Sequence, residues 1–179
     1  MEIFLVSGVG RSGTTLSAFD AALQKGGIHN YNLLGLSSVI PVGSAIKVVP
    51  SHRSPEDEHG YLLYVVLAEA RSERCGDSLA AGLAWYQLDD GRGVFAEHSE
   101  LSRTLAPAEV EASVADRLAA MARDLCSHRG WRFEEARLLT QAISAQVRAE
   151  PTSVLVAAVY ESQRFIGLCA SEPAKGGSS

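Results

Sequence analysis

Two adjacent serines, Ser37 and Ser38, stand where a short apolar segment runs into a turn. The segment begins at Asn32, and Pro41 follows the pair. A serine hydroxyl can attack the carbonyl carbon of the preceding residue if the backbone is strained there and the oxyanion is stabilised. A tight turn at a strand end can supply that strain. Because a lone serine pair is more commonly a solvated turn, the flanking residues must decide between these interpretations.

A second stretch that could do chemistry is the glycine-rich run GVGRSGTT of residues 8–15. It follows a strand-like segment and precedes a helix-like one, so its N–H groups could bind a phosphate or sulfate. Gly8 and Gly13 have P-loop spacing, but Thr14 stands where the phosphate-binding lysine belongs. The run also resembles the phosphosulfate-binding loop of sulfotransferases. We interpret it as a tight turn that aims the first helix, with a nucleotide or phosphosulfate site at Gly8 to Thr15 as the alternative.

The residues around the serine pair form a longer pattern. Residues 16–23 read LSAFDAAL, and residues 27–32 read GIHNYN. This pattern resembles the processing region of the pyruvoyl-dependent arginine decarboxylases, in which a helix L-x-A-F-D-x-A-L leads through G-I-x-N-x-N-L into a strand ending S-S-x-x-P. All of these elements are present at the separations of the family. The resemblance continues more thinly as far as Tyr160.

The resemblance implies that the chain cleaves itself between Ser37 and Ser38. The Ser38 hydroxyl would turn the peptide into an ester, elimination would release the Ser37 carboxylate, and hydrolysis would leave a pyruvoyl group at residue 38. Residues 1–37 and 38–179 would become separate chains. The covalent pyruvoyl cofactor would form a Schiff base with L-arginine and accept electrons as CO2 leaves, which gives agmatine.

The same resemblance assigns residues to cleavage and substrate binding. Leu16 and Asp20 are one helical turn apart and would contact the substrate, with the Asp20 carboxylate on the guanidinium group. Asn32 would shape the site, and its amide could donate to a developing oxyanion. Together with Ser38, these residues would form the amino-terminal part of the active site.

A proton donor is implied farther along the chain. Residues 93–98 read GVFAEH and resemble the family strand that ends in Glu-Tyr, so Glu97 would protonate the carbon left by CO2. His98 stands where the family commonly has tyrosine. Glu100 is a nearby rival for the same role.

The resemblance also implies an α/β (α+β) fold, a four-layer α/β/β/α sandwich formed by a single domain over residues 1–168. The family is usually a homotrimer with active sites between subunits. Residues 51–60 form an acidic, histidine-bearing loop where the family commonly has a Pro- and Gly-rich stretch. That departure leaves two alternatives open, namely the same chemistry on another amino acid and an unprocessed, non-catalytic homologue.

Periodicity and turn residues predict the elements that must position these side chains. The expected strands are residues 2–7, 32–38, 61–68, 93–97 and 153–160, and the expected helices are residues 16–25, 77–88 and 108–127. Residues 137–147 fit either helix or strand. Thr15 is the expected cap of the first helix. Residues 50–60 are predicted to be a surface loop, and residues 169–179 a disordered tail.

Composition limits the remaining possibilities. The chain has 179 residues, 46% of them apolar, and a net charge of −5 without a basic stripe, so we expect no nucleic-acid partner. No apolar run approaches the roughly 20 residues that span a bilayer, so we expect no membrane partner and a cytoplasmic protein. Cys75, Cys126 and Cys169 have no CxxC spacing, which predicts free thiols and no metal site.

Overall fold

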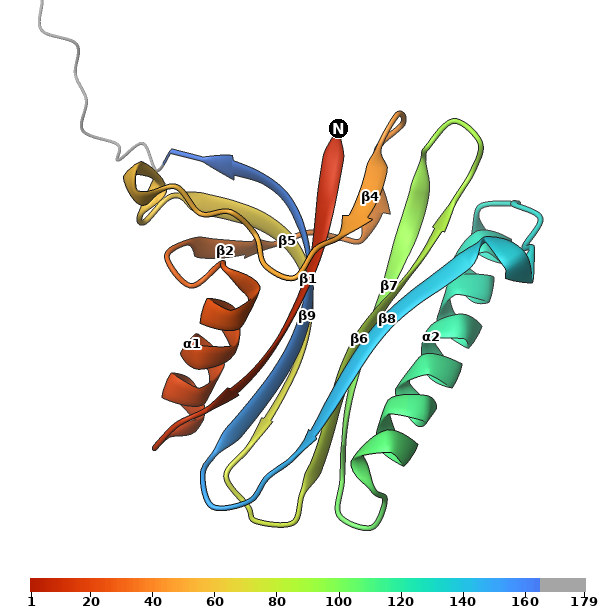
Figure 1. The fold of residues 1–179 in the computed structure, drawn as a ribbon. Helices are drawn as coiled ribbons and strands as arrows, with labels where there is room; N and C mark the ends of the chain where they lie inside the picture. The colour runs from red at the N-terminus through yellow and green to blue at the C-terminus, as the bar shows by residue number, and fades with distance from the viewer. Residues whose placement is uncertain (165–179) are drawn as a thin grey trace, which may run out of the picture.

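The computed structural model describes residues 1–164, which form four layers (Figure 1). Helix α1 (Thr15–Gly26) covers a five-stranded sheet, which packs against a four-stranded sheet, and helix α2 (Pro107–His128) covers the outer face of the second sheet. The predicted α/β/β/α sandwich is thus confirmed. The predicted disordered tail and Cys169 lie outside the described residues. None of the helices within residues 1–164 has the length and apolarity needed to cross a membrane.

The five-stranded sheet has the order β2-β5-β9-β1-β4. Its strands are β1 (Glu2–Arg11), β2 (Asn32–Gly35), β4 (Ala45–Val48), β5 (Leu62–Ser72) and β9 (Thr152–Gln163). Both edge strands run parallel to their neighbours, whereas β9 is antiparallel to β1 and β5. The last strand of the fold therefore occupies the centre of this sheet.

The four-stranded sheet is antiparallel and has the order β3-β7-β6-β8. Its strands are β3 (Val39–Ile40), β6 (Ser78–Gln87), β7 (Gly93–Ser102) and β8 (Leu138–Gln146). The short helices η1 (Glu56–Glu58) and η2 (Glu135–Arg137) lie in connections. Of residues 137–147, which fitted helix or strand, residues 138–146 thus form strand β8.

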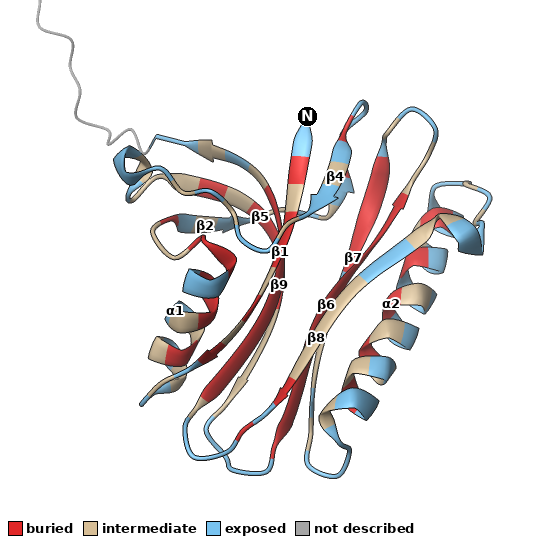
Figure 2. Ribbon diagram, in the orientation of Figure 1, coloured by how far each residue is buried: buried red, intermediate tan, exposed pale blue. Residues whose placement is uncertain are grey.

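The main core lies between the sheets, and each helix closes a smaller one (Figure 2). Alternation along β9 explains why its whole apolar run is buried. Val154 and Val156 face the other sheet, whereas Leu155 and Ala157 face α1. The prediction of a buried strand over residues 153–160 is confirmed, although β9 extends beyond it.

The helix predicted over residues 77–88 is wrong, because these residues form the central strand β6. The run SLAAGLAWYQ is apolar on both faces, so helical spacing occurs in it by chance. Leu79 and Leu83 pack between the sheets, while Ala80 and Ala84 pack under α2. A Cβ at Gly82 would lie 2.9 Å from Leu118 Cδ1. The small residues therefore allow α2 to approach the strand closely.

The turn predicted over Gly8 to Gly13 is also wrong for most of its length, because β1 continues to Arg11. The first helix is capped by Thr14 rather than Thr15, with Thr14 Oγ1 accepting the Ser17 N–H at 3.1 Å. At Gly8 and Gly10 a Cβ would overlap backbone atoms of α1. These glycines permit close packing of helix on strand, which accounts for them without a phosphate ligand.

Replacing Gly10 with alanine should therefore destabilise the protein by about 1–3 kcal/mol, because the new Cβ would collide with the Ala18 carbonyl and the Ala22 amide. Urea unfolding followed by circular dichroism measures this loss. Gly13→Ala is the matched control, since a Cβ there meets nothing within 4 Å. Equal stability of the two variants would contradict the packing role.

Candidate active site

The serine pair lies in a short crossover between the two sheets. Strand β2 ends at Gly35 in one sheet, and β3 begins at Val39 in the other, so the strand predicted through Ser38 ends earlier than expected. The Leu36 N–H donates to the Val65 carbonyl at 2.9 Å, and the Ser38 carbonyl accepts the Phe95 N–H at 2.8 Å. The bond between Ser37 and Ser38 is thus held from both sheets.

The backbone at Ser38 is strained. Its φ is +67°, and within residues 1–164 every other positive φ belongs to a glycine. A side chain in this left-handed region costs roughly 1–3 kcal/mol and persists only where the surroundings impose it. The strain expected from the sequence is therefore present on the carboxyl side of the predicted scissile bond.

The hydroxyl of Ser38 donates to Glu97 Oε2 at 2.6 Å. Alternation along β7 explains this contact, because Phe95 points into the core between the sheets and Glu97, two residues later, shares its face. Glu97 also borders an open pocket of about 330 Å³, together with its neighbours His98 and Ser99 and with Leu67 to Glu69 from β5. A carboxylate and a hydroxyl thus meet at the crossover, and a pocket adjoins the carboxylate.

The rival carboxylate Glu100 lies on the opposite face of β7. Its Oε2 accepts a hydrogen bond from Ser113 of α2 at 2.9 Å and lies 3.8 Å from Arg117 Nε. His98 is on the same side, with Nε2 3.9 Å from Glu100 Oε2. The pleat of the strand therefore separates both residues from the Ser38 side chain.

Tyr160 of β9 is part of this site, although the sequence pattern indicated only that it lies at the end of a strand. Its hydroxyl donates to the Val39 carbonyl at 3.0 Å, and its ring meets the Phe95 ring edge-on, with centroids 6.2 Å apart. Burial, and secondly the nearby Glu97 carboxylate, raise the pKa of Tyr160. The hydroxyl therefore remains protonated and acts as a donor.

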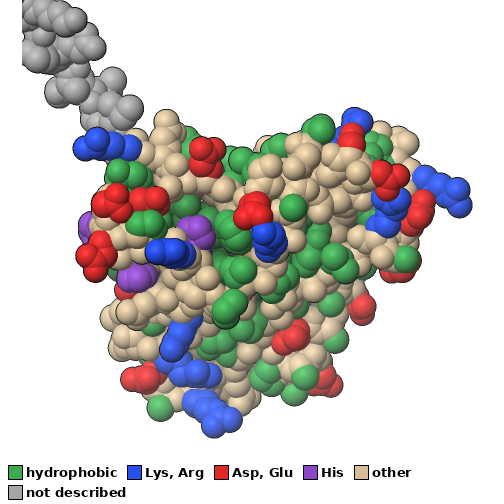
Figure 3. Space-filling model, turned by 45° about the horizontal axis from the view of Figure 1, so that its top comes forward, with side chains coloured by type: hydrophobic (Ala, Val, Ile, Leu, Met, Phe, Trp, Pro, Cys, Tyr) green, Lys and Arg blue, Asp and Glu red, His purple; other side chains and the backbone are tan. Residues whose placement is uncertain are grey.

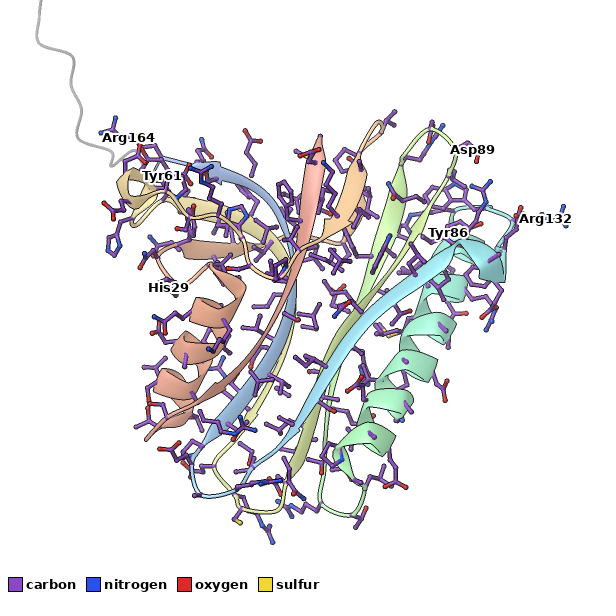
Figure 4. All side chains as sticks on the ribbon, in the orientation of Figure 1. His29, Tyr61, Tyr86, Asp89, Arg132 and Arg164 are labelled. Carbon is purple, nitrogen blue, oxygen red and sulfur yellow. The ribbon has the colours of Figure 1, made fainter. Side chains whose placement is uncertain are left out.

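Leu16, Asp20 and Asn32 lie away from Ser38 in the same chain. Leu16 is 71% exposed and Asp20 is exposed, because α1 buries its other face, which carries Ala18 and Ala22. The Asn32 amide donates to the Gly60 carbonyl at 2.8 Å, and its N–H donates to the carbonyl of Tyr61, on the left in Figure 4. One chain thus brings Ser38 to Glu97 but not to these three residues.

The surface beside the crossover is apolar. Val39 and Val42 are 52% and 66% exposed, and Val48 of β4 is also exposed. Figure 3 brings this end of the molecule forward and shows hydrophobic side chains gathered in the middle of the face around one acidic and one basic side chain, with most other charged groups toward its sides. Such a surface is suited to burial against another protein chain.

Comparison with known proteins gives one consistent result. A profile of the pyruvoyl-dependent arginine decarboxylase family (PvlArgDC) matches residues 2–165. The chain is 33% identical to a pyruvoyl-dependent arginine decarboxylase of Halobacterium salinarum over 163 residues, which cover 90% of this chain and 95% of the relative.

Two further relatives carry the same name. The Methanothermobacter thermautotrophicus protein is 33% identical over 135 residues, 75% of this chain and 82% of the relative. The Methanopyrus kandleri protein is 30% identical over 162 residues, 87% of this chain and 93% of the relative. With a family match over nearly the whole chain and a site centred on Ser38 and Glu97, the protein belongs to the pyruvoyl-dependent arginine decarboxylase family.

Proposed function

We propose that the chain cleaves itself between Ser37 and Ser38 and, once processed, converts L-arginine to agmatine and CO2. The observation that carries the proposal is the strained Ser38, whose hydroxyl bonds Glu97 at 2.6 Å. Family membership supplies the reaction class, carboxy-lyase chemistry with a covalent pyruvoyl cofactor.

In the processing step, Glu97 accepts the proton of the Ser38 hydroxyl while Oγ attacks the Ser37 carbonyl carbon. The C–N bond between the two residues breaks, and the nitrogen takes up a proton, so an ester replaces the amide. Loss of the Ser38 Cα proton then breaks the Cβ–Oγ bond and releases the Ser37 carboxylate. Water replaces the nitrogen, which leaves as ammonia, and residue 38 becomes the pyruvoyl group.

The residues around Ser38 fit such a group. The pyruvoyl group supplies a ketone for the substrate amine and an adjacent amide carbonyl that withdraws electrons as CO2 leaves. That amide carbonyl is the carbonyl of residue 38, and the Phe95 N–H donates to its oxygen at 2.8 Å. A fixed N–H donor stabilises negative charge that develops on this oxygen. The Glu97 carboxylate contacts residue 38 through the Ser38 hydroxyl, and after processing it would return a proton to the substrate carbon.

Substrate binding requires a second copy of the chain. Because Leu16 and Asp20 are exposed on α1, which lies outside the five-stranded sheet, they would serve the Ser38 site of a neighbouring subunit. Asn32 would contribute in the same way. The exposed Val39 and Val42 beside the crossover would be covered by that contact. We therefore propose a homotrimer with active sites between subunits.

Two alternatives remain within the family, namely the same chemistry on another amino acid and an unprocessed, non-catalytic homologue. They are tested by supplying each amino acid separately to the purified protein and measuring CO2. We expect release from L-arginine, with agmatine formed in equal amount. Release from a different amino acid would refute the assignment of the substrate, and no release from any of them would favour the non-catalytic homologue.

Asp20→Asn should raise KM for arginine roughly 10- to 100-fold, since an amide replaces the carboxylate that would bind the guanidinium. Steady-state decarboxylation at varied arginine concentration measures the change. Asp124→Asn, which alters an exposed aspartate on α2, is the matched control and should leave KM unchanged. An unchanged KM in Asp20→Asn would remove this residue from the substrate site.

A further inference from the structure

We propose that Tyr160 is a positioning residue that holds the new chain end after self-cleavage, by donating its hydroxyl to the Val39 carbonyl. The inference rests on the proposed cleavage at Ser38. Tyr160 comes from β9 in the five-stranded sheet, whereas Val39 belongs to β3 in the four-stranded sheet, so this 3.0 Å hydrogen bond joins the two sheets at the site.

Before cleavage, the crossover is restrained on both sides of the scissile bond. On the amino-terminal side, the Leu36 N–H donates to Val65 at 2.9 Å, and the continuous chain transmits this restraint to Ser38. On the carboxyl-terminal side, the chain enters β3, which is only two residues long. In the intact chain, the Tyr160 hydroxyl is therefore one restraint among several.

After cleavage, residue 38 is a chain end and the bond at Leu36 no longer restrains it. Next to it lie the Phe95 N–H on the carbonyl of residue 38 and the pairing of the two-residue strand β3 with β7, both in the four-stranded sheet, and the Tyr160 hydroxyl on the carbonyl of Val39, which comes from the five-stranded sheet. The two residues that supply these donors, Phe95 and Tyr160, belong to opposite sheets, and their rings pack edge-on. Because a reacting group must be held within a fraction of an ångström, loss of one donor should reduce turnover.

The test is Tyr160→Phe, which keeps the ring and its contact with Phe95 but removes the hydroxyl. Intact mass against time gives the processing rate, which should stay within about fivefold of wild type. Steady-state kinetics per mole of processed chain should show kcat reduced roughly 10- to 100-fold, with KM for arginine unchanged. A merely structural role would lower thermal stability without this division between kcat and KM.

Tyr86→Phe is the matched control. The Tyr86 hydroxyl also donates to a main-chain carbonyl, that of Arg132, at 2.9 Å, but it does so beside the start of β8 (Figure 4). This variant should lose stability and keep the kcat of wild type.

A second measurement separates the cleaved from the intact chain. Exchange of the amide hydrogens of Val39, Ile40 and Val42 should accelerate by about fivefold when Tyr160→Phe is introduced into processed protein. In a Ser38→Ala background, which cannot be cleaved, Tyr160→Phe should change these exchange rates little. Normal kcat in processed Tyr160→Phe, or equal acceleration in both backgrounds, would overturn the inference. A wild-type chain that stays intact would instead overturn the proposed function on which it rests.

Discussion

Ser38→Ala should yield a single chain of 179 residues that releases no CO2 from arginine. The substitution removes the hydroxyl that attacks the Ser37 carbonyl, and with it the only source of the pyruvoyl group. Added keto compounds cannot restore activity, because the cofactor must be covalently part of residue 38. Intact mass under denaturing conditions and CO2 release measure the two effects.

Ser37→Ala is the control for this variant. The cleavage uses the main-chain carbonyl of residue 37 and the side chain of residue 38, so Ser37→Ala should still be processed and active. Its shorter chain, residues 1–37, should be lighter by one oxygen atom. If Ser37→Ala instead of Ser38→Ala blocked cleavage, the roles of the two serines would have to be exchanged.

Glu97→Gln should slow decarboxylation by about 10²- to 10⁴-fold per processed chain, and it should slow processing as well. Glutamine keeps the size of the side chain and can still accept a hydrogen bond from Ser38. It cannot take up the hydroxyl proton or return a proton to the substrate carbon. Both steps therefore lose their acid–base group, while the 2.6 Å contact that positions Ser38 is largely preserved.

Glu100→Gln separates this role from a general effect of charge on β7. Glu100 binds Ser113 of α2 on the outer face of the four-stranded sheet, so its loss should affect stability and leave kcat at the wild-type level. Low kcat in Glu100→Gln together with normal kcat in Glu97→Gln would show that the wrong carboxylate has been assigned.

The elements with the clearest patterns were predicted from the sequence. The helix over residues 108–127 matches α2, and the apolar run over residues 153–160 lies within β9. In both, burial against the sheets selects one regular pattern, namely amphipathic spacing in the helix and a continuous apolar run in the central strand.

The two largest errors of prediction share one physical cause. In residues 77–88 and in the run from Gly8 to Gly13, small residues serve close approach between a helix and a strand. Alanine also favours helices, and glycine also favours turns, so single residues in sequence do not reveal a packing role. The partner that requires the small side chain is far away along the chain, as Leu118 is from Gly82.

Part of the candidate site could be predicted from the sequence, and part could not. The family pattern indicated Ser38 and Glu97, which are far apart in sequence and which the fold joins by a hydrogen bond. The contributions of Phe95 and Tyr160 depend on register and crossover geometry, since one acts through its backbone N–H and the other reaches across from the opposite sheet. The roles given to Leu16, Asp20 and Asn32 await a test in the assembled protein.

The intact mass of the purified wild-type protein under denaturing conditions tests the central claim most directly. We predict two chains, residues 1–37 and residues 38–179, with the longer chain blocked to amino-terminal sequencing because residue 38 has lost its amine. That result would establish cleavage at the strained Ser38 and formation of the cofactor from it. A single chain of 179 residues would contradict self-processing and the decarboxylase activity that depends on it.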